Sequence, residues 1–497
     1  MKNESQPYEI ASPKPAALIE ALRAVGYNLP TAIADIIDNS LTADARNVDL
    51  HFHWAGSESR ISIIDDGRGM SESELHEAMR PGSRSPLEER TPEDLGRFGL
   101  GLKTASFSQC RSLTVISKAR GATPCSRCWD LEYVADHDEW RLLKTPAPGS
   151  EEWLRRIHDR PSGTAVVWSR LDRITGADRT ADAAAHVRFN DAIDHVRQHL
   201  ALVFHRFFAD GSLSVKINGD AIRAWDPFLE NHTATYRTAE ERIPFGKSPV
   251  VFRGFVLPHK DKLQAAEFAA AAGPYGWAAH QGFYVYRNRR LLVFGDWLRL
   301  GNPNAWTRDE QFKLARIRLD TTNETDSEWH LDVKKSTARP PVAIRDRLTQ
   351  LGGEVRRMAR EVFAHRGRYG PRAPAPQDIE RPWVSQVRNG HRVYSIDRSH
   401  PIVGGVIRRC GQAAQEVETL LRILEETVPV QQIWLDSAEQ TYDHAVPYDG
   451  VDYSVLRADM RRLFEMLTTS GINAQTARER MRSIEPFNRY PNLIKEL

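Results

Sequence analysis

The chain has 497 residues, of which 41% are hydrophobic and 27% are charged. These values are ordinary for a soluble globular protein, and the length predicts about two to four domains. Because 68 basic residues are balanced by 66 acidic ones, the net charge of +2 does not by itself indicate a nucleic-acid partner. No apolar run reaches the roughly 18 residues of a membrane span, and the N-terminal stretch MKNESQPYEI has no signal-peptide core. With only four cysteines, a cytoplasmic protein without a membrane partner is expected.

After a first amphipathic helix over 14–25, the first motif with chemical character is a helix predicted over 31–43. Asp35 and Asn39 are four residues apart there and therefore project from one face. A carboxylate beside a carboxamide can activate water and bind a hard cation such as Mg²⁺. An amphipathic helix with a polar outer face accounts for the same spacing, so this motif alone leaves both interpretations open.

The second motif, DDGRGM, follows a β-branched strand predicted over 60–65. A carboxylate at the end of a strand, here Asp65, can accept a hydrogen from an exocyclic amine. Gly67 and Gly69 would let the backbone approach a flat base. Taken alone, the pattern also fits a tight turn after a strand.

The third motif, LGRFGLGLKTAS, places glycines before a helix predicted over 100–108. Such glycines expose N–H groups to an anionic phosphate, and the helix dipole adds attraction. A dinucleotide fingerprint would need an acidic residue after the next strand, and SLTVISK does not provide it. No GxxxxGK[ST] occurs either, which excludes a P-loop.

In order and spacing, these motifs resemble those of the GHKL ATPase superfamily, the group of gyrase, the heat-shock chaperone, histidine kinases and MutL. The resemblance is closest to MORC-type and prokaryotic MORC-like ATPases, where a helix reading roughly AIAELIDNSxDA precedes DxGxGM and GxFGxGxKS. The segment SGTAVV at 162–167 matches a fourth, late Gly-Thr element of that family. The resemblance implies ATP and Mg²⁺ as cofactors and a Bergerat-type α/β sandwich with a mixed sheet.

The resemblance also implies roles for individual residues. Asn39 would ligate Mg²⁺, Asp65 would read the adenine amino group, and Thr164 would support the base. The base and phosphates would further be held by Gly67, Gly69, Met70, Gly96, Phe98, Gly99, Leu100, Gly101, Leu102 and Lys103. Residues 71–95 would be a mobile lid that closes over the phosphates.

One position departs from the family pattern. The water-activating residue is usually Glu, whereas this chain has Asp35, whose side chain reaches roughly 1.5 Å less far. A general base must come within hydrogen-bond distance of its water. Asp35 is therefore expected to act through a shifted helix or a second water, or to hydrolyse ATP slowly.

Further strands of this domain are predicted near 47–54, 112–118, 128–134 and 164–168, with a helix over 72–80. A long helix over 183–208 carries His195 and His199 at a spacing that a metal could use. Without an HExxH motif, a solvated helix face is the preferred interpretation. Cys125 and Cys128 form a single CxxC without a second nearby pair, which favours a loop with free thiols over a zinc site.

The segment 213–297 is β-rich, with a turn signal at 218–219, and it resembles the transducer domain of gyrase, MutL and MORC-type proteins. In that family a transducer lysine reaches the γ-phosphate. Lys334 and Lys335, in WHLDVKKSTARPP, are the candidates, and Lys335 is preferred because it directly precedes the small-residue turn. An ordinary basic strand end explains the same residues.

Residues 339–372 hold nine arginines and three acidic residues. The first part, 342–366, is predicted as a helix with a broken centre at Gly352 and Gly353. Arginine-rich helices often bind phosphates, so DNA is a candidate partner, and a solvated cationic face is the alternative. A Pro-rich linker follows, and then a hairpin and helices over 411–428, 453–468 and 473–483.

These elements divide the chain into four parts. Residues 1–182 are predicted to be the ATP-binding domain and 183–368 a linker helix with an α+β transducer-like domain. Residues 369–379 are predicted to be a Pro-rich linker and 380–497 a mostly helical C-terminal domain.

The resemblance implies a Mg²⁺-dependent ATPase whose ATP-driven homodimerisation acts as a DNA-associated clamp or remodeller. Its context would be prokaryotic restriction or antiviral phage defence, with partner proteins from a defence operon. One alternative is a chaperone-like clamp on a protein client. Another is a non-hydrolysing, nucleotide-gated scaffold, because of Asp35. A histidine kinase is disfavoured, since no histidine precedes the asparagine helix.

Overall fold

The computed structural model of the chain describes residues 13–24, 26–82, 101–174, 183–325, 328–329, 338–364, 380–388, 391–430, 433, 447–448 and 451–497. The chain forms two compact units, Met1–Gly370 and Pro371–Leu497.

The first unit begins with a seven-stranded mixed sheet in the order β4-β3-β5-β2-β1-β6-β7. Its strands are β1 (Asn47–His53), β2 (Arg60–Asp65), β3 (Ser112–Lys118), β4 (Cys125–Asp130), β5 (Gly163–Ser169), β6 (Ser214–Ile217) and β7 (Asp220–Ala221). β1 and β6 are parallel, and the other neighbouring pairs are antiparallel. Because β6 follows residue 182, the sheet extends beyond the boundary predicted for the ATP-binding domain.

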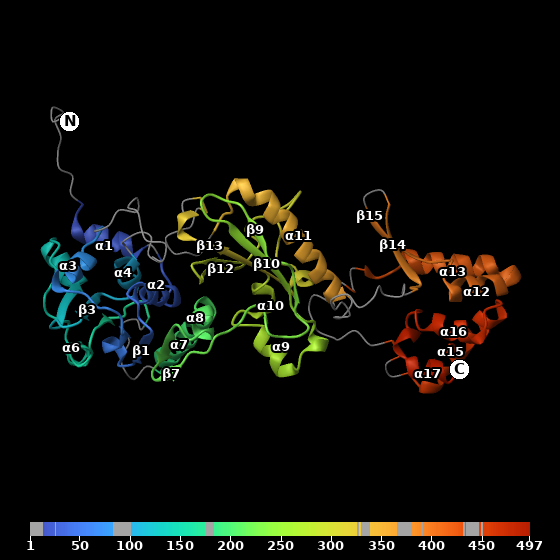
Figure 1. Ribbon diagram of the computed structural model, residues 1–497, viewed down its shortest axis with the longest axis horizontal. Helices are drawn as coiled ribbons and strands as arrows, with labels where there is room; N and C mark the ends of the chain where they lie inside the picture. Colours follow the sequence, from blue (N-terminus) through green and yellow to red (C-terminus); the bar gives the residue numbers. More distant parts are fainter. Residues whose placement is uncertain are drawn as a thin grey trace, which may run out of the picture. The chain divides into compact units, whose positions relative to one another are not determined.

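Helices cover both faces of this sheet, which makes it an α/β sandwich (Figure 1). The helices of the larger core are α1 (Pro15–Arg23), α2 (Leu29–Thr42), α3 (Glu72–Met79), α4 (Gly101–Phe107), α5 (Leu131–His137) and α7 (Ala183–Val203), while α6 (Glu151–His158) packs on the opposite face. Alternation along β5 serves both faces: Val166 and Trp168 point to the larger core, and Ala165 and Val167 point to α6.

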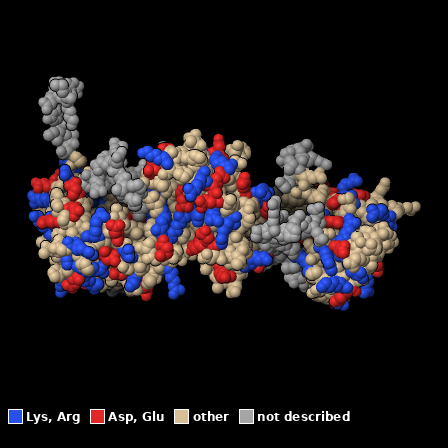
Figure 2. All heavy atoms as spheres, viewed as in Figure 1, with Lys and Arg blue, Asp and Glu red and all other residues tan. Residues whose placement is uncertain are grey.

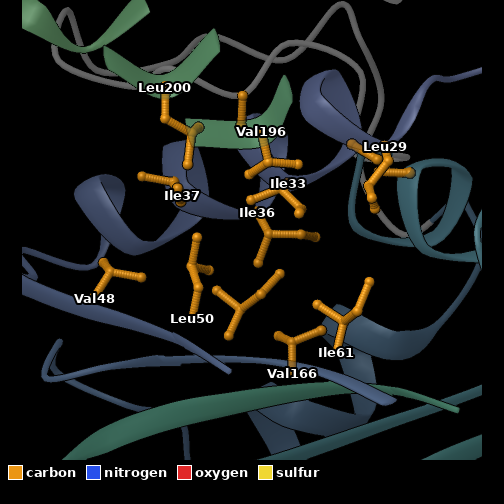
Figure 3. Packing of buried hydrophobic residues seen from close by; sticks show 14 of the residues in the cluster. Leu29, Ile33, Ile36, Ile37, Val48, Leu50, Ile61, Val166, Val196 and Leu200 are labelled. Atoms are coloured by element: carbon orange, nitrogen blue, oxygen red, sulfur yellow. The ribbon is translucent and has the colours of Figure 1, made fainter. Parts of the chain in front are cut away.

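α2 is sandwiched between the sheet and α7, as Figure 3 shows. Its apolar residues Ile33, Ile36 and Ile37 are at most 2% exposed. The Asn28 side chain caps the helix by accepting a hydrogen bond from the N–H of Thr31, and Pro30 occupies the first turn. Burial on both sides fixes α2 firmly, so the side chains on its edges have defined positions.

Two elements end differently from the sequence prediction. The strand predicted over 128–134 is wrong in its second half, because β4 stops at Asp130 and α5 follows. The Asp130 carboxylate accepts hydrogen bonds from the N–H groups of Glu132 and Tyr133, which is an N-cap that starts a helix. The helix predicted over 183–208 is interrupted at Phe204, where α7 gives way to α8 (His205–Ala209).

Two predictions for cysteine and histidine also need correction. Cys125 and Cys128 lie on β4 rather than in a loop, and both are free thiols. His199 is not on a solvated face: it is 8% exposed, and burial lowers its pKa to about 3. His195 is exposed, as predicted. Within the described ranges, no group of three or more metal-binding side chains comes together.

A second, six-stranded sheet follows in the same unit, in the order β12-β11-β13-β10-β8 with β9 paired to β10. Its strands are β8 (Tyr236–Arg237), β9 (Glu241–Ile243), β10 (Val250–Val256), β11 (Gly282–Arg287), β12 (Arg290–Asp296) and β13 (Ala315–Thr321). The helices of this part are α9 (Ala265–Ala271), α10 (Gly276–Ala279) and α11 (Val342–Ala364). α11 packs on β10 and β13 (Figure 1).

α11 is continuous, so the break predicted at Gly352 and Gly353 is wrong. A Cβ on Gly352 would lie 2.9 Å from the Trp306 ring and 3.1 Å from the Phe283 ring. The glycine therefore permits close packing of the helix on these aromatic residues, at a modest cost in helix propensity.

The second unit contains the predicted hairpin and helices. β14 (Trp383–Arg388) pairs antiparallel with β15 (His391–Ile396). The helices are α12 (Pro401–Arg409), α13 (Ala414–Glu426), α15 (Tyr453–Thr469), α16 (Ala474–Met481) and α17 (Pro491–Lys495). A small core forms around α15 and α16, with Met460, Leu463 and Met481 almost fully buried. The Pro-rich linker at 369–379 lies outside the described residues. Among the helices that are described, none is both long and apolar enough to cross a membrane.

Candidate functional site

α2 presents the two polar residues of the first motif in different environments. Asp35 is 7% exposed, whereas Asn39, one turn later, is exposed. The Tyr27 hydroxyl donates a 2.9 Å hydrogen bond to Oδ2 of Asp35. A Cβ on Gly101, at the start of α4, would lie 4.0 Å from the same oxygen. The first and third motifs therefore meet at Asp35.

Asp65 ends β2 with both carboxylate oxygens engaged. Ser40 Oγ, from α2, donates to Oδ2 at 2.9 Å. The N–H groups of Gly67 and Thr164 donate to Oδ1 at 3.0 and 3.2 Å. Burial raises the pKa of Asp65, and these hydrogen bonds oppose that rise. The carboxylate is thus fixed in one orientation by donors from three separate segments.

The two glycines of the second motif lie against backbone. Gly69 has φ +69°, and a Cβ there would lie 1.9 Å from the carbonyl oxygen of Lys118. A Cβ on Gly67 would lie 2.8 Å from the carbonyl oxygen of Ala43. Any side chain at these positions would push the DDGRGM turn away from α2 and β3, so the turn needs glycine for geometric reasons.

The late Gly-Thr element, which contains Thr164, is connected to the second motif by hydrogen bonds through the hydroxyl of Ser117. Ser117 on β3 accepts a hydrogen bond from the N–H of Met70 at 2.8 Å, and its hydroxyl lies 2.8 Å from that of Thr164. β5 pairs with β2 in a register that places Thr164 opposite Asp65. The structure therefore brings Asp65, Met70 and Thr164 together at one end of neighbouring strands.

Lys103, on α4, is only 2% exposed. Its Nζ donates a 2.9 Å hydrogen bond to the carbonyl oxygen of Ala78, at the end of α3. Burial lowers its pKa to about 8. Near neutral pH the amine is still protonated, and an anion bound beside it would favour this charged form and raise its pKa.

Several predicted site residues cannot be placed. Gly96, Phe98, Gly99, Leu100, Lys334 and Lys335 lie outside the described residues. Of the predicted lid at 71–95, the described part is not a free loop. It begins with α3, whose Leu75 and Met79 are fully buried, and whose Ser71 and Glu74 form a capping box.

Three residues that hold these side chains in place were not predicted from the sequence: Tyr27, Ser40 and Ser117. Ser40 follows Asn39 directly and so carried a weak signal, whereas Ser117 is one of several polar residues in the strand SLTVISK and did not stand out. Tyr27 carried none, because it precedes the motif helix and reaches Asp35 only through the tertiary fold.

Comparisons with known proteins agree with this geometry. Residues 27–164 match the family of histidine kinase-, DNA gyrase B- and HSP90-like ATPases. The chain is 33% identical over 91 residues to the ATPase morc-1 of Caenorhabditis elegans, covering 18% of this chain and 10% of that protein. It is 27% identical over 236 residues to the DNA mismatch repair protein MutL of Acidiphilium cryptum, covering 46% and 36% of the two chains.

A third relative is the human structural maintenance of chromosomes flexible hinge domain-containing protein 1. It is 29% identical over 129 residues, which cover 21% of this chain and 6% of that protein. The chain thus spans at most 36% of the length of any of these three relatives. The sandwich fold and the four ordered motifs define residues 27–164 as an ATPase domain of the GHKL class. Over this domain the chain is similar to GHKL ATPases, among them a MORC ATPase.

Proposed function

We propose that the chain binds Mg²⁺-ATP between α2, the end of β2 and α4, hydrolyses it, and uses ATP-driven homodimerisation to act on DNA as a clamp or remodeller. The observation that carries the proposal is the Asp65 carboxylate. It lies at the end of β2 within the GHKL-type domain, and three donors hold it in place.

In this proposal Asp65 accepts a hydrogen from the adenine amino group, because each carboxylate oxygen has more than one acceptor site. Gly67, Gly69 and Met70 would line the base, and Thr164 would support it. The close approach of Gly67 to the end of α2 and of Gly69 to β3 leaves no room for side chains at these positions.

Mg²⁺ and the phosphates would bind on the α2–α4 side. Asn39 is exposed and can offer its carboxamide oxygen to Mg²⁺, a cation that prefers oxygen ligands and shares them with phosphates. Gly101, Leu102 and Lys103, with the preceding glycines, would hold the phosphates at the N-terminus of α4. Lys335, or Lys334, is proposed to reach the γ-phosphate from the transducer-like domain.

The names of the relatives support a DNA-associated role, since one is a DNA mismatch repair protein and another is named for maintenance of chromosomes. ATP-dependent dimerisation, a cytoplasmic location, and partners from a prokaryotic defence operon are further parts of the proposal, and they rest on the resemblance alone.

One arginine of the cluster that the sequence pointed to, Arg356, is not available to DNA. Arg356 is 9% exposed, and its guanidinium carbon lies 3.6 Å from the Phe312 ring centroid and 4.4 Å from that of Trp297. Arg357 is exposed and pairs with Glu361. On the face shown in Figure 2, basic and acidic side chains are interspersed over the first unit. A DNA contact through α11 is therefore expected from exposed arginines such as Arg360 and not from Arg356.

Steady-state phosphate release with and without duplex DNA tests the proposal, with Asp35→Ala as the blank. DNA stimulation above that blank is the expected result. Hydrolysis that ignores DNA would instead favour a chaperone-like clamp on a protein client. In the same series, Asn39→Ala is expected to abolish Mg²⁺-ATP binding, and unchanged affinity would refute the site.

The contact between Tyr27 and Asp35 favours a second candidate, a nucleotide-gated scaffold that does not hydrolyse ATP. A short carboxylate that is 7% exposed and already hydrogen-bonded is poorly placed to reach a water molecule. ATP binding and dimerisation without phosphate release would identify this behaviour.

A further inference from the structure

The turn between β11 and β12 brings two consecutive arginines toward the helices of the first sheet. Asn288 and Arg289 form a two-residue turn, and both have positive φ, at 47° and 72°. Such turns match the twist of the strands they connect. Arg289 and Arg290 then point away from the second sheet to two different helices.

Arg290 reaches α2. Its Nε lies 2.9 Å from Oδ1 of Asp38, and the two side chains are 5% and 2% exposed. The guanidinium carbon also lies 4.6 Å from the centroid of the Phe204 ring, at the end of α7. The ion pair is therefore enclosed between α2, α7 and β12, although its partners are 252 residues apart.

Arg289 makes the contrasting contact. It pairs with Asp210, just after α8, and these side chains are 45% and 51% exposed. A neighbouring pair, Arg206 and Asp320, likewise joins α8 to the second sheet. Neither of these pairs touches α2, whereas the Asp38–Arg290 pair does.

The position of Asp38 makes its pair relevant to the nucleotide. It directly precedes Asn39 and follows Asp35 by three residues on the same rigid helix. A buried ion pair is costly to break, because separation leaves an uncompensated charge in the interior. The pair therefore joins β12 directly to the helix that carries Asn39.

We propose that Arg290 is a positioning residue that fixes α2 for Mg²⁺-ATP through Asp38 and couples nucleotide binding to the second sheet. This inference rests on the proposed nucleotide site. It differs from that proposal because the link runs through a buried pair that does not itself touch the nucleotide.

The test measures Mg²⁺-ATP affinity by calorimetry and hydrogen–deuterium exchange with a slowly hydrolysed ATP analogue. In the wild type, the analogue is expected to slow exchange both in 29–42 and in 282–296. Arg290→Gln should weaken binding by at least about tenfold, the lower range for partners that support ligand-binding residues. The variant should also lose protection in 282–296 and keep it only in the first sheet. Arg290→Lys should recover part of the affinity and part of the protection in 282–296.

Arg289→Gln is the matched control, because it removes the same charge from the adjacent turn position without reaching α2. It should leave affinity and the protection pattern unchanged. If Arg290→Gln fails to fold, the double variant Asp38→Asn with Arg290→Gln removes both charges and avoids the unpaired ion. It should fold, yet still lose protection in 282–296.

The outcomes separate this inference from the proposed function. Absence of protection in 29–42 of the wild type would refute the nucleotide site itself. Protection in 29–42 without protection in 282–296 would overturn the coupling alone. An Arg290→Gln variant with a lower melting temperature but wild-type affinity and protection would show that the pair only stabilises the fold.

Discussion

Tyr27 and Asp35 form a buried hydrogen bond of 2.9 Å, in which the phenol donates to Oδ2 of the carboxylate. The proposed catalytic base is therefore held by a residue outside its own helix. A carboxylate restrained in this way has a fixed orientation, but one of its oxygens is partly occupied.

This contact predicts how Asp35 and Tyr27 respond to substitution. Asp35→Glu restores the usual family residue, but the additional methylene, roughly 1.5 Å of length, would push the carboxylate into the Tyr27 hydroxyl. We expect Asp35→Glu alone to leave hydrolysis no faster than in the wild type. Combined with Tyr27→Phe it should raise kcat about tenfold or more, since a well-placed base contributes 10²–10⁴-fold.

Steady-state kcat for both single variants and the double variant checks this. A large gain from Asp35→Glu by itself would mean that Tyr27 does not limit the space around the base.

Asp65→Asn should affect both folding and selectivity. The neutral carboxamide would accept the N–H groups of Gly67 and Thr164 more weakly than the carboxylate does, and its nitrogen would face Ser40, whose hydroxyl would then have to accept instead of donate. The expected loss of unfolding free energy is about 1–3 kcal/mol, together with loss of preference for ATP over GTP. Chemical denaturation and competition binding measure the two effects.

Asp66→Asn is the matched control for Asp65→Asn, because Asp66 also accepts backbone hydrogen bonds, from Arg46 and Asn47, but is exposed. It should retain nucleotide selectivity. Equal ATP and GTP binding in the wild type would contradict the assignment of Asp65 to adenine.

The lowered pKa of Lys103 predicts that ATP binding is coupled to proton uptake. Its free-state pKa of about 8 lies below the ordinary 10.5 because of burial, so the amine is largely neutral near pH 9. A bound phosphate favours the charged form and raises the pKa, so ATP binding near pH 9 should take up close to one proton. Near pH 7 the amine is already protonated in both states, and the uptake should vanish.

Calorimetry in buffers of different ionisation enthalpy measures this uptake. Lys103→Arg keeps its charge across this range and should show no uptake at either pH. Wild-type binding without proton uptake near pH 9 would place Lys103 away from the phosphates.

Arg356 is expected to act in stability rather than in DNA binding. It lies among Trp297, Trp306 and Phe312, and burial lowers its pKa to about 10. Arg356→Ala should lower the unfolding free energy by about 1–3 kcal/mol through loss of cation–π and packing contacts. Its affinity for duplex DNA should not change.

Arg360→Ala is the comparison for Arg356→Ala, because Arg360 lies on the same helix, α11, but is exposed. Weaker DNA binding by Arg356→Ala, with a reduced salt dependence, would contradict this prediction. It would mean that Arg356 leaves the aromatic residues around it when DNA binds.

The sequence alone determined individual elements such as α2 and β2, and the GHKL class of the domain that contains them. The apolar stripe of Ile33, Ile36 and Ile37 gave α2 a clear helical period, and the β-branched run before Asp65 gave β2. Both signals are local, because each depends on residues within a few positions of one another. The ordered motifs were equally legible, since their glycines and carboxylates serve backbone geometry and ligand chemistry that recur across the superfamily.

Only the tertiary structure decided which side chains meet. The sequence of 342–366 shows an arginine-rich helix, but whether Arg356 faces solvent or an aromatic cluster depends on residues some 40–60 positions earlier. Local helix propensity predicts a break at Gly352. The structure instead shows that a glycine is needed there because the Trp306 ring packs against the helix. The Tyr27–Asp35 bond and the Asp38–Arg290 pair were invisible for the same physical reason. Such contacts form between surfaces that come together only when the sheets and helices pack, and no periodicity along the chain encodes that meeting.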